Sequence, residues 1–147
     1  MTSSIVGLWS LTDFVIKSPS AQSIKWPFGQ KPFGYLSYHF SGHMQALLCH
    51  ETRSPFPKDL EHAHLANDQV KAQAFNESLS YGGEWRRTGN NMAHHVQFAT
   101  NPQIMGQILF RRIDTLDDKN LILSYDVPSR KGLLEYILSW HKISPSE

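Results

Sequence analysis

Four polar side chains alternate with apolar residues on predicted strands and are the candidates for chemistry in this chain: Asp13, Tyr38, His94 and Arg111. Apolar surroundings disfavour a charged carboxylate, whereas a neighbouring arginine keeps it ionised, and both states are useful in acid–base chemistry. An imidazole takes a proton from an acidic carbon or hydroxyl and returns it elsewhere. Arginine and tyrosine stabilise the enolate or oxyanion that develops. The set therefore predicts catalysis of a ring closure, enolisation or dehydration.

The direction of these side chains depends on strand register, which can be derived from the stretch 34–48. A two-residue turn at 41–42 would mix polar and apolar side chains on both faces. A three-residue loop over 40–42, with Gly42 as the left-handed residue of a G1 bulge, separates them. We therefore predict the second register. It turns Tyr38 and His50 inward, and His39 and His43 outward.

The rest of the chain predicts an all-β fold with one helix. Residues 5–16 alternate as a strand, and residues 17–33 read as an aromatic-rich loop that could act as a lid. Helical spacing runs from 60 to 79, with a cap at Asn67-Asp68 and a stop at Gly82-Gly83. The remaining predicted strands are 83–87, 92–98, 104–113, 120–126 and 133–143. We predict a single domain over 1–147, an eight-stranded antiparallel up-and-down barrel with the α-helix inserted after the third strand.

The inward positions of these strands are mostly apolar or aromatic, which suits a pocket for a hydrophobic ligand held by a few polar groups. Alternation also assigns Phe98 and Gln107 to the inside. The predicted substrate-binding residues are Leu11, Met44, His50, Trp85, Leu109, Tyr125 and Tyr136. Structural interpretations stand beside the catalytic ones, since Asp13 and Arg111 could form an ion pair and His94 could be a hydrogen-bonded core histidine.

Composition excludes several classes of function. The net charge is +1 and the arginine pairs are isolated, so no basic stripe for nucleic acid is present. The one cysteine, Cys49, cannot form an internal disulfide, and residues 1–4 lead into a strand without an apolar signal core, which predicts a cytoplasmic protein. No apolar run approaches the roughly 20 residues that span a bilayer. No zinc motif or phosphate-binding glycine loop occurs, so we expect neither metal nor cofactor.

Five segments in order resemble one known family. Gly7-Leu8-Trp9 matches the G-x-W signature of lipocalins. The others are Pro27-Phe28-Gly29 through Gly42-His43-Met44, Tyr81-Gly82-Gly83-Glu84-Trp85, His94-His95-Val96 and Trp140-His141-Lys142. Together they resemble the small intracellular lipocalin-like domain family over nearly the whole chain. The resemblance implies an antiparallel barrel whose central pocket takes a small, largely apolar molecule.

Two positions depart from the pattern of that family. Lys142 stands where an arginine usually packs on the first-strand tryptophan, and it can still make a cation–π contact. Trp9 and Lys142 are expected to form a structural plug at the closed end of the barrel. Asp13 stands where a small neutral residue is usual, which puts a carboxylate in a strand that often has none.

Several lipocalin-like proteins encoded beside polyketide pathways act as cyclases, isomerases or pericyclic catalysts without a cofactor. The resemblance therefore implies a cofactor-independent enzyme that folds a polyketide-like chain and promotes its cyclisation or isomerisation. Two alternatives remain open: a carrier that uses the same pocket without chemistry, and an interaction protein that binds through the helix and through Trp26 and Phe28. The expected partner is a small hydrophobic molecule rather than nucleic acid or membrane, and a homodimer is left open.

Overall fold

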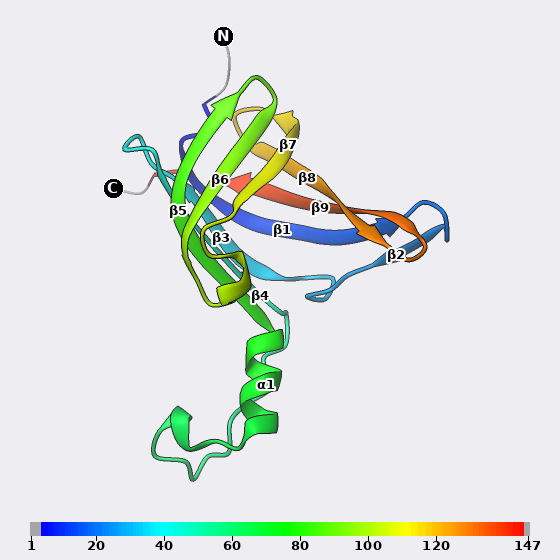
Figure 1. Ribbon diagram of the computed structural model, residues 1–147. Helices are drawn as coiled ribbons and strands as arrows, with labels where there is room; N and C mark the ends of the chain where they lie inside the picture. Colours follow the sequence, from blue (N-terminus) through cyan, green and yellow to red (C-terminus); the bar gives the residue numbers. More distant parts are fainter. Residues whose placement is uncertain (1–3, 146–147) are drawn as a thin grey trace.

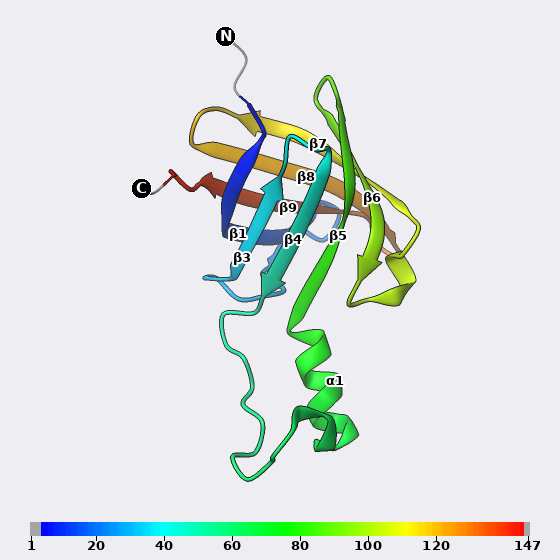
Figure 2. The same ribbon diagram turned by 90° about the vertical axis from the view of Figure 1, so that its left-hand side faces the viewer.

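The strands of the computed structural model, which describes residues 4–145, form one antiparallel sheet closed into a barrel (Figures 1 and 2). The strands are β1 (Gly7–Ser18), β2 (Ser23–Lys25), β3 (Phe33–Tyr38), β4 (His43–Cys49), β5 (Ser78–Thr88), β6 (Asn91–Ala99), β7 (Ile108–Leu116), β8 (Asn120–Ser129) and β9 (Gly132–Lys142). The helices are α1 (Asp68–Asn76) and two 3₁₀ turns, Ala63–Leu65 and Pro102–Ile104. Residues 1–3 and 146–147, which the domain and N-terminal predictions include, lie outside the described range.

Eight strands close the barrel, as the sequence predicted. Each strand pairs with its neighbour in the order β1, β3, β4, β5, β6, β7, β8, β9, and β9 pairs again with β1. The short strand β2 lies in the segment predicted as a loop and pairs only with the far end of β1. The helix therefore follows β4 rather than a third strand, because β2 adds one strand to the count. None of the helices in the described range is long and apolar enough to cross a membrane.

One end of the barrel is closed by Trp9, which is fully buried. Its indole Nε1 donates a hydrogen bond to the carbonyl of Ile5 at 2.9 Å. The Lys142 ammonium lies 4.8 Å from the centre of the Trp9 ring and donates to the carbonyl of Val6 at 2.7 Å. Lys142 thus makes the expected cation–π contact, and its hydrogen bond also links the residue before β1 to β9.

The β3–β4 hairpin has the predicted register. Tyr38 pairs with Met44 and Leu36 with Ala46, and Gly42 has a φ of 85°, in the left-handed region. The amide of His39 donates to the carbonyl of His43 at 2.9 Å, so that three residues form the loop. Tyr38 is accordingly buried. Burial of these inward side chains stabilises the barrel by about 1.5–3 kcal/mol for each large one.

Three register shifts interrupt the alternation of the strands. They lie between Leu11 and Asp13 on β1, between Ile113 and Thr115 on β7, and opposite the pair Gly82–Gly83, where β6 carries one extra residue. Each extra residue is a β-bulge, after which every side chain changes face. The inward assignments of Asp13 and Phe98 are therefore wrong. Phe98 is 55% exposed, and Gln107 lies before β7 and is also exposed.

Residues 51–77 form an arm that extends away from the barrel and ends in α1 (Figure 2). The Asn67 side chain accepts from the amide of Val70 at 2.9 Å and caps the helix, as predicted. The helix ends at Asn76 and not at the glycine pair, because β5 already begins at Ser78. No residue of α1 is buried, and among the described residues the core cluster includes none from the arm.

Gly83 is the glycine that the β5–β6 bulge requires. A Cβ on this residue would overlap the backbone carbonyl oxygen of His95, which belongs to the neighbouring strand and cannot move as a flexible side chain does. We expect Gly83→Ala to lower the free energy of unfolding by about 3 kcal/mol. Gly89→Ala is the control, because its φ is 60° and no atom lies within 4 Å of the new methyl. It should cost only about 1 kcal/mol. Urea unfolding curves of both variants test this, and equal losses would contradict it.

Candidate functional site

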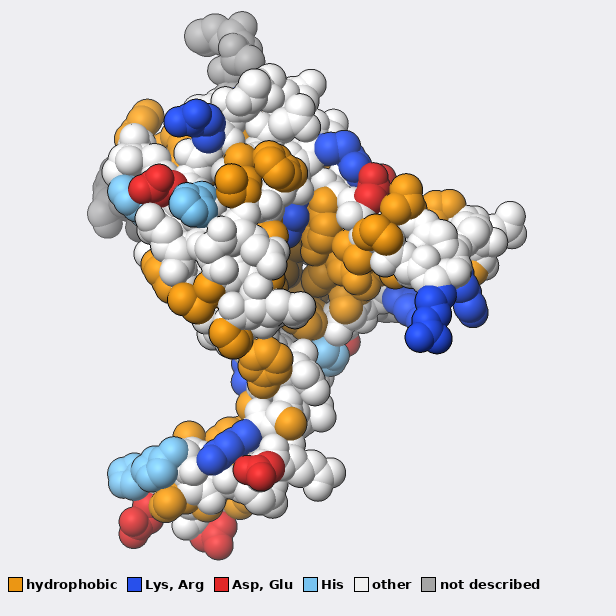
Figure 3. All heavy atoms as spheres, in the orientation of Figure 1, with side chains coloured by type: hydrophobic (Ala, Val, Ile, Leu, Met, Phe, Trp, Pro, Cys, Tyr) orange, Lys and Arg blue, Asp and Glu red, His pale blue; other side chains and the backbone are white. Residues whose placement is uncertain are grey.

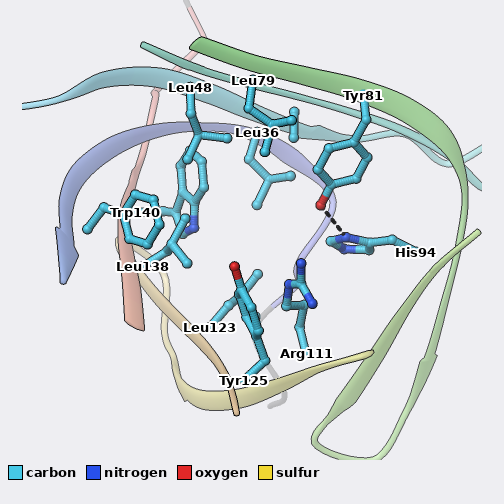
Figure 4. A pocket seen from close by; sticks show the side chains of 12 residues that line it. Leu36, Leu48, Leu79, Tyr81, His94, Arg111, Leu123, Tyr125, Leu138 and Trp140 are labelled. Carbon is cyan, nitrogen blue, oxygen red and sulfur yellow. Dashed lines mark hydrogen bonds between the residues drawn. The ribbon is translucent and has the colours of Figure 1, made fainter. Parts of the chain in front are cut away.

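A small cavity lies inside the barrel, and its wall is mostly apolar (Figure 4). The volume open to the centre of a water-sized molecule is about 50 Å³. Since one water needs roughly 10–15 Å³ by the same measure, the cavity holds only a few non-hydrogen atoms. The lining residues whose side chains carry a nitrogen or oxygen atom are Tyr81, His94, Arg111, Tyr125 and Trp140, and the purely apolar ones are Phe14, Leu36, Ala46, Leu48, Leu79, Leu123 and Leu138.

Three polar side chains form a buried row that reaches this cavity. The Tyr38 hydroxyl lies 2.6 Å from His94 Nε2, and the Tyr81 hydroxyl lies 2.8 Å from His94 Nδ1. The three residues come from β3, β6 and β5, and since β4 and β5 separate β3 from β6, the row joins these strands through the interior of the barrel. Tyr81 and His94 line the cavity, whereas Tyr38 lies behind His94 and beside the Trp85 ring, at 5.3 Å between ring centres.

The imidazole of His94 is neutral at ordinary pH. Burial, followed by the positive charge of Arg111, lowers the pKa of His94 from 6.5 to about 3. Burial also raises the pKa of Tyr38 and of Tyr81 above their usual value, so both phenols keep their protons. The row therefore consists of three neutral groups that share hydrogen bonds.

A neutral imidazole has one donor and one acceptor nitrogen, which restricts how the protons are arranged. Within residues 4–145, His94 is the one hydrogen-bond partner of the buried Tyr38 hydroxyl. If Tyr38 donates to Nε2, then Nδ1–H donates to Tyr81, and the Tyr81 O–H is left to point at the cavity. The opposite arrangement would bury the Tyr38 proton without an acceptor, at a cost of about 1–3 kcal/mol. The first arrangement is therefore favoured, and it makes Tyr81 a hydrogen-bond donor toward a ligand.

Arg111 is the one cationic residue among those that line the cavity, and no lining residue carries a carboxylate. Its guanidinium carbon lies 3.6 Å from the centre of the Tyr125 ring, and Nη1 donates to the carbonyl of Phe110 at 3.0 Å. Burial raises the pKa of Tyr125 to about 12, with the Arg111 charge opposing the shift. A positive charge over an aromatic face in an apolar cavity is suited to an anionic or strongly polar oxygen of a ligand.

The cavity opens where β7 and β8 part. The two strands pair from Leu116–Leu121 to Arg112–Ser124, and the ladder stops there. Arg111 and Tyr125 are the next residues on each side, so their cation–π contact spans the start of the gap. Figure 3 shows a hollow in this region, between β7 and the β8–β9 hairpin, with hydrophobic side chains gathered along one wall.

Three predicted site residues line the cavity: His94, Arg111 and Tyr125. Tyr38 reaches it only through His94. Tyr136 contacts the Tyr125 ring at 5.0 Å but is not itself part of the lining.

The other predicted substrate-binding residues lie elsewhere in the fold. Leu11 and Met44 are buried in the core, and Leu109 and Trp85 pack partly buried against it. His50 lies just past the end of β4, where its Nδ1 accepts from the amide of Thr52 and its ring contacts Phe28.

The prediction that Asp13 faces the cavity is wrong. The bulge after Leu11 turns the next inward position to Phe14, which lines the cavity in its place. In the sheet Asp13 lies opposite Ser139 of β9, and both side chains are on the outer face of the barrel. Asp13 therefore does not form an ion pair with Arg111 across the cavity.

Sequence reasoning missed Tyr81 as a site residue. The segment before Gly82 had been assigned to the helix, although Leu79, Ser80 and Tyr81 already alternate as a strand does. Alternation along 133–143 points Trp140 inward, but it does not show that the indole N–H is a polar group of the site. Among residues 4–145, no cluster of three or more His, Cys, Asp or Glu side chains could hold a metal ion.

Replacement of His94 provides a test of its neutral state. In the unfolded chain His94 has an ordinary pKa near 6.5, and in the fold its pKa is about 3. The folded form is therefore favoured fully above pH 6.5 and loses this advantage as the pH falls toward 3. The contribution should fall by about 2 kcal/mol between pH 7 and pH 5.

The measurement is urea unfolding at pH 7, 6 and 5. We expect His94→Gln to lose less stability than the wild type across this range, by about that amount. His39→Gln is the control, because His39 is exposed and its imidazole bonds only the Ser37 hydroxyl in the described range. Parallel pH dependence of the wild type and His94→Gln would contradict a buried neutral imidazole.

Comparison with known proteins identifies one family. The chain matches the family model of the lipocalin-like domain over residues 6–143. A search of curated proteins found no match.

Proposed function

The chain belongs to the lipocalin-like domain family, and on that premise we propose that it is a cofactor-independent enzyme of polyketide-type metabolism. Its barrel binds a hydrophobic molecule that carries a carbonyl or enol oxygen. It promotes cyclisation or isomerisation of that molecule by holding it folded and by stabilising the enolate that forms.

The observation that carries this proposal is the buried row of Tyr38, His94 and Tyr81 beside Arg111. The row directs the Tyr81 O–H toward the cavity, and the Arg111 charge lies in the same lining. When a proton leaves the carbon next to a carbonyl, the negative charge moves to the carbonyl oxygen. A fixed hydroxyl donor and a cation in an apolar cavity stabilise that oxygen, and one such donor is worth about a hundredfold to a thousandfold in rate.

The size of the cavity limits what enters it. With about 50 Å³, only the reacting end of a substrate fits beside Tyr81 and Arg111. The remaining apolar chain would lie in the hollow between β7 and the β8–β9 hairpin (Figure 3). Orientation by these walls could remove roughly 7–11 kcal/mol of a cyclisation barrier.

A carrier of the same class of molecule is the second candidate, and one observation favours it. No side chain in the lining is free to accept a proton, because both nitrogens of His94 are engaged and no carboxylate is present. In the enzymatic proposal the proton must therefore pass to water or to another group of the substrate. A carrier needs no such acceptor.

Hexanoylacetone, a β-diketone with an apolar tail, separates the two functions. NMR measures exchange of its central methylene protons for deuterium, and calorimetry measures its affinity. We expect the wild type to accelerate exchange and Tyr81→Phe to lower that acceleration about a hundredfold. Affinity should fall no more than about tenfold, because one neutral hydrogen bond is lost.

Tyr136→Phe is the matched control, since Tyr136 contacts Tyr125 but does not line the cavity. It should leave both quantities within about twofold. Tight binding by the wild type without any acceleration would support the carrier instead. Failure to bind hexanoylacetone, together with closely related hydrophobic ketones, would overturn both proposals.

A further inference from the structure

Trp140 has a buried polar atom without a partner. Its side chain is 3% exposed, and its indole Nε1 has no hydrogen-bond acceptor among residues 4–145. Buried indole N–H groups usually find an acceptor, because an unmet donor costs free energy. Trp140 also lines the cavity, so the residue with the unpaired donor is part of the cavity wall.

The other indoles held by the barrel show that the fold supplies acceptors where it needs them. Trp9 Nε1 donates to the carbonyl of Ile5 at 2.9 Å, and Trp85 Nε1 donates to the carbonyl of His39 at 3.0 Å. The Ser124 hydroxyl is likewise buried without a partner in the described range, but it does not line the cavity. Trp140 is thus a lining residue of the cavity whose indole N–H has no hydrogen-bond partner in the described range.

We propose that Trp140 Nε1 is a second ligand-binding donor, and that the bound compound carries two acceptor oxygens with apolar carbons between them. This inference rests on the proposed function, because one of the oxygens is the one that Tyr81 and Arg111 bind. Figure 4 shows Trp140 on the side of the cavity opposite to Tyr81, His94 and Arg111, with leucine side chains between. A dicarbonyl compound or a keto acid has the oxygens and the carbons that these two walls require.

The class of ligand follows from the chemistry of the two walls. The indole is a neutral donor and cannot accept, so its partner is a carbonyl, ether or hydroxyl oxygen. The opposite wall combines the Tyr81 hydroxyl with the Arg111 charge, which favours the oxygen with more negative charge. The compound is therefore polar at both ends, and where its two oxygens differ in charge, the more negative one lies against Tyr81 and Arg111.

Short straight-chain methyl ketones, with pentane or hexane chains, provide the test, because the cavity is small. Each chain length is used with a ketone at one end or at both ends, and affinities are measured by calorimetry. We expect the wild type to bind one diketone about threefold to tenfold more tightly than the monoketone of the same length. Trp140→Phe should lose this preference and bind the diketone no more tightly than the monoketone of the same length. Trp26→Phe, at an indole 40% exposed outside the cavity, should keep the preference.

A second measurement needs no variant. The indole N–H resonance of Trp140 in the wild type should shift when the preferred diketone binds, and should shift less with the monoketone. If Trp140→Phe keeps the preference, or the resonance responds equally to both, the inference is overturned.

Tyr81→Phe separates this failure from failure of the proposed function. It should weaken both kinds of ketone by a similar factor and keep the preference for the diketone. If Trp140→Phe has no effect while Tyr81→Phe weakens both, the second donor is excluded and the first site stands. If the wild type binds no ketone of the series, the inference and the proposed site fail together.

Discussion

The two hydrogen bonds of the buried His94 imidazole are the interaction on which the candidate site depends. They join three strands, because the partners lie on β3 and β5 while His94 lies on β6. Burial keeps the ring neutral, and a neutral ring with two tyrosine neighbours allows one satisfied arrangement of protons. The direction of the Tyr81 hydroxyl thus follows from the burial of the Tyr38 hydroxyl, on the other side of the ring. A chemical property of the cavity is fixed by a group that never touches it.

Two cation–π contacts lie in different parts of the barrel and differ in what else they do. At the closed end, Lys142 sits over Trp9 and donates to backbone carbonyls near the start of the chain. A compact ammonium suits this place, because several acceptors surround it. At the parted strands, the planar guanidinium of Arg111 covers the Tyr125 ring at 3.6 Å. The charge of Arg111 faces a cavity lining without carboxylates. The Lys142–Trp9 contact therefore stabilises the fold, whereas the Arg111–Tyr125 contact places a positive charge in the cavity, where it suits an oxygen atom of a ligand.

The sequence was sufficient for the barrel and for one wall of the site. Alternation predicted eight closing strands, and Gly42 fixed the hairpin register that buries Tyr38. Alternation alone did not identify the β-bulges, because two consecutive polar residues such as Thr12-Asp13 also fit a regular strand with one polar residue facing inward, whereas a bulge reverses every face that follows. That is why Asp13 was placed in the cavity where Phe14 lies.

The missed Tyr81 has a different cause. The apolar spacing of the arm continues into β5, so the boundary between helix and strand cannot be read from periodicity. Trp140 shows a further limit: its inward direction was predictable, but the lack of an acceptor depends on backbone carbonyls from other strands. Contacts of that kind arise only when the whole sheet is assembled.

The gap between β7 and β8 has a consequence for solubility. A closed barrel has no strand edges. Here the pairing of β7 with β8 ends at Arg112–Ser124, so beyond that pair each of the two strands has a short unpaired edge. Free edges are templates on which another chain can add a strand. On the outer face Arg112 bonds Asp126 at 2.9 Å and Glu135 at 3.2 Å, so three charged side chains straddle the start of the gap. Charged side chains at a strand edge oppose the addition of another strand. The gap can therefore stay open to a ligand without becoming a site where the strands of another chain pair and aggregate.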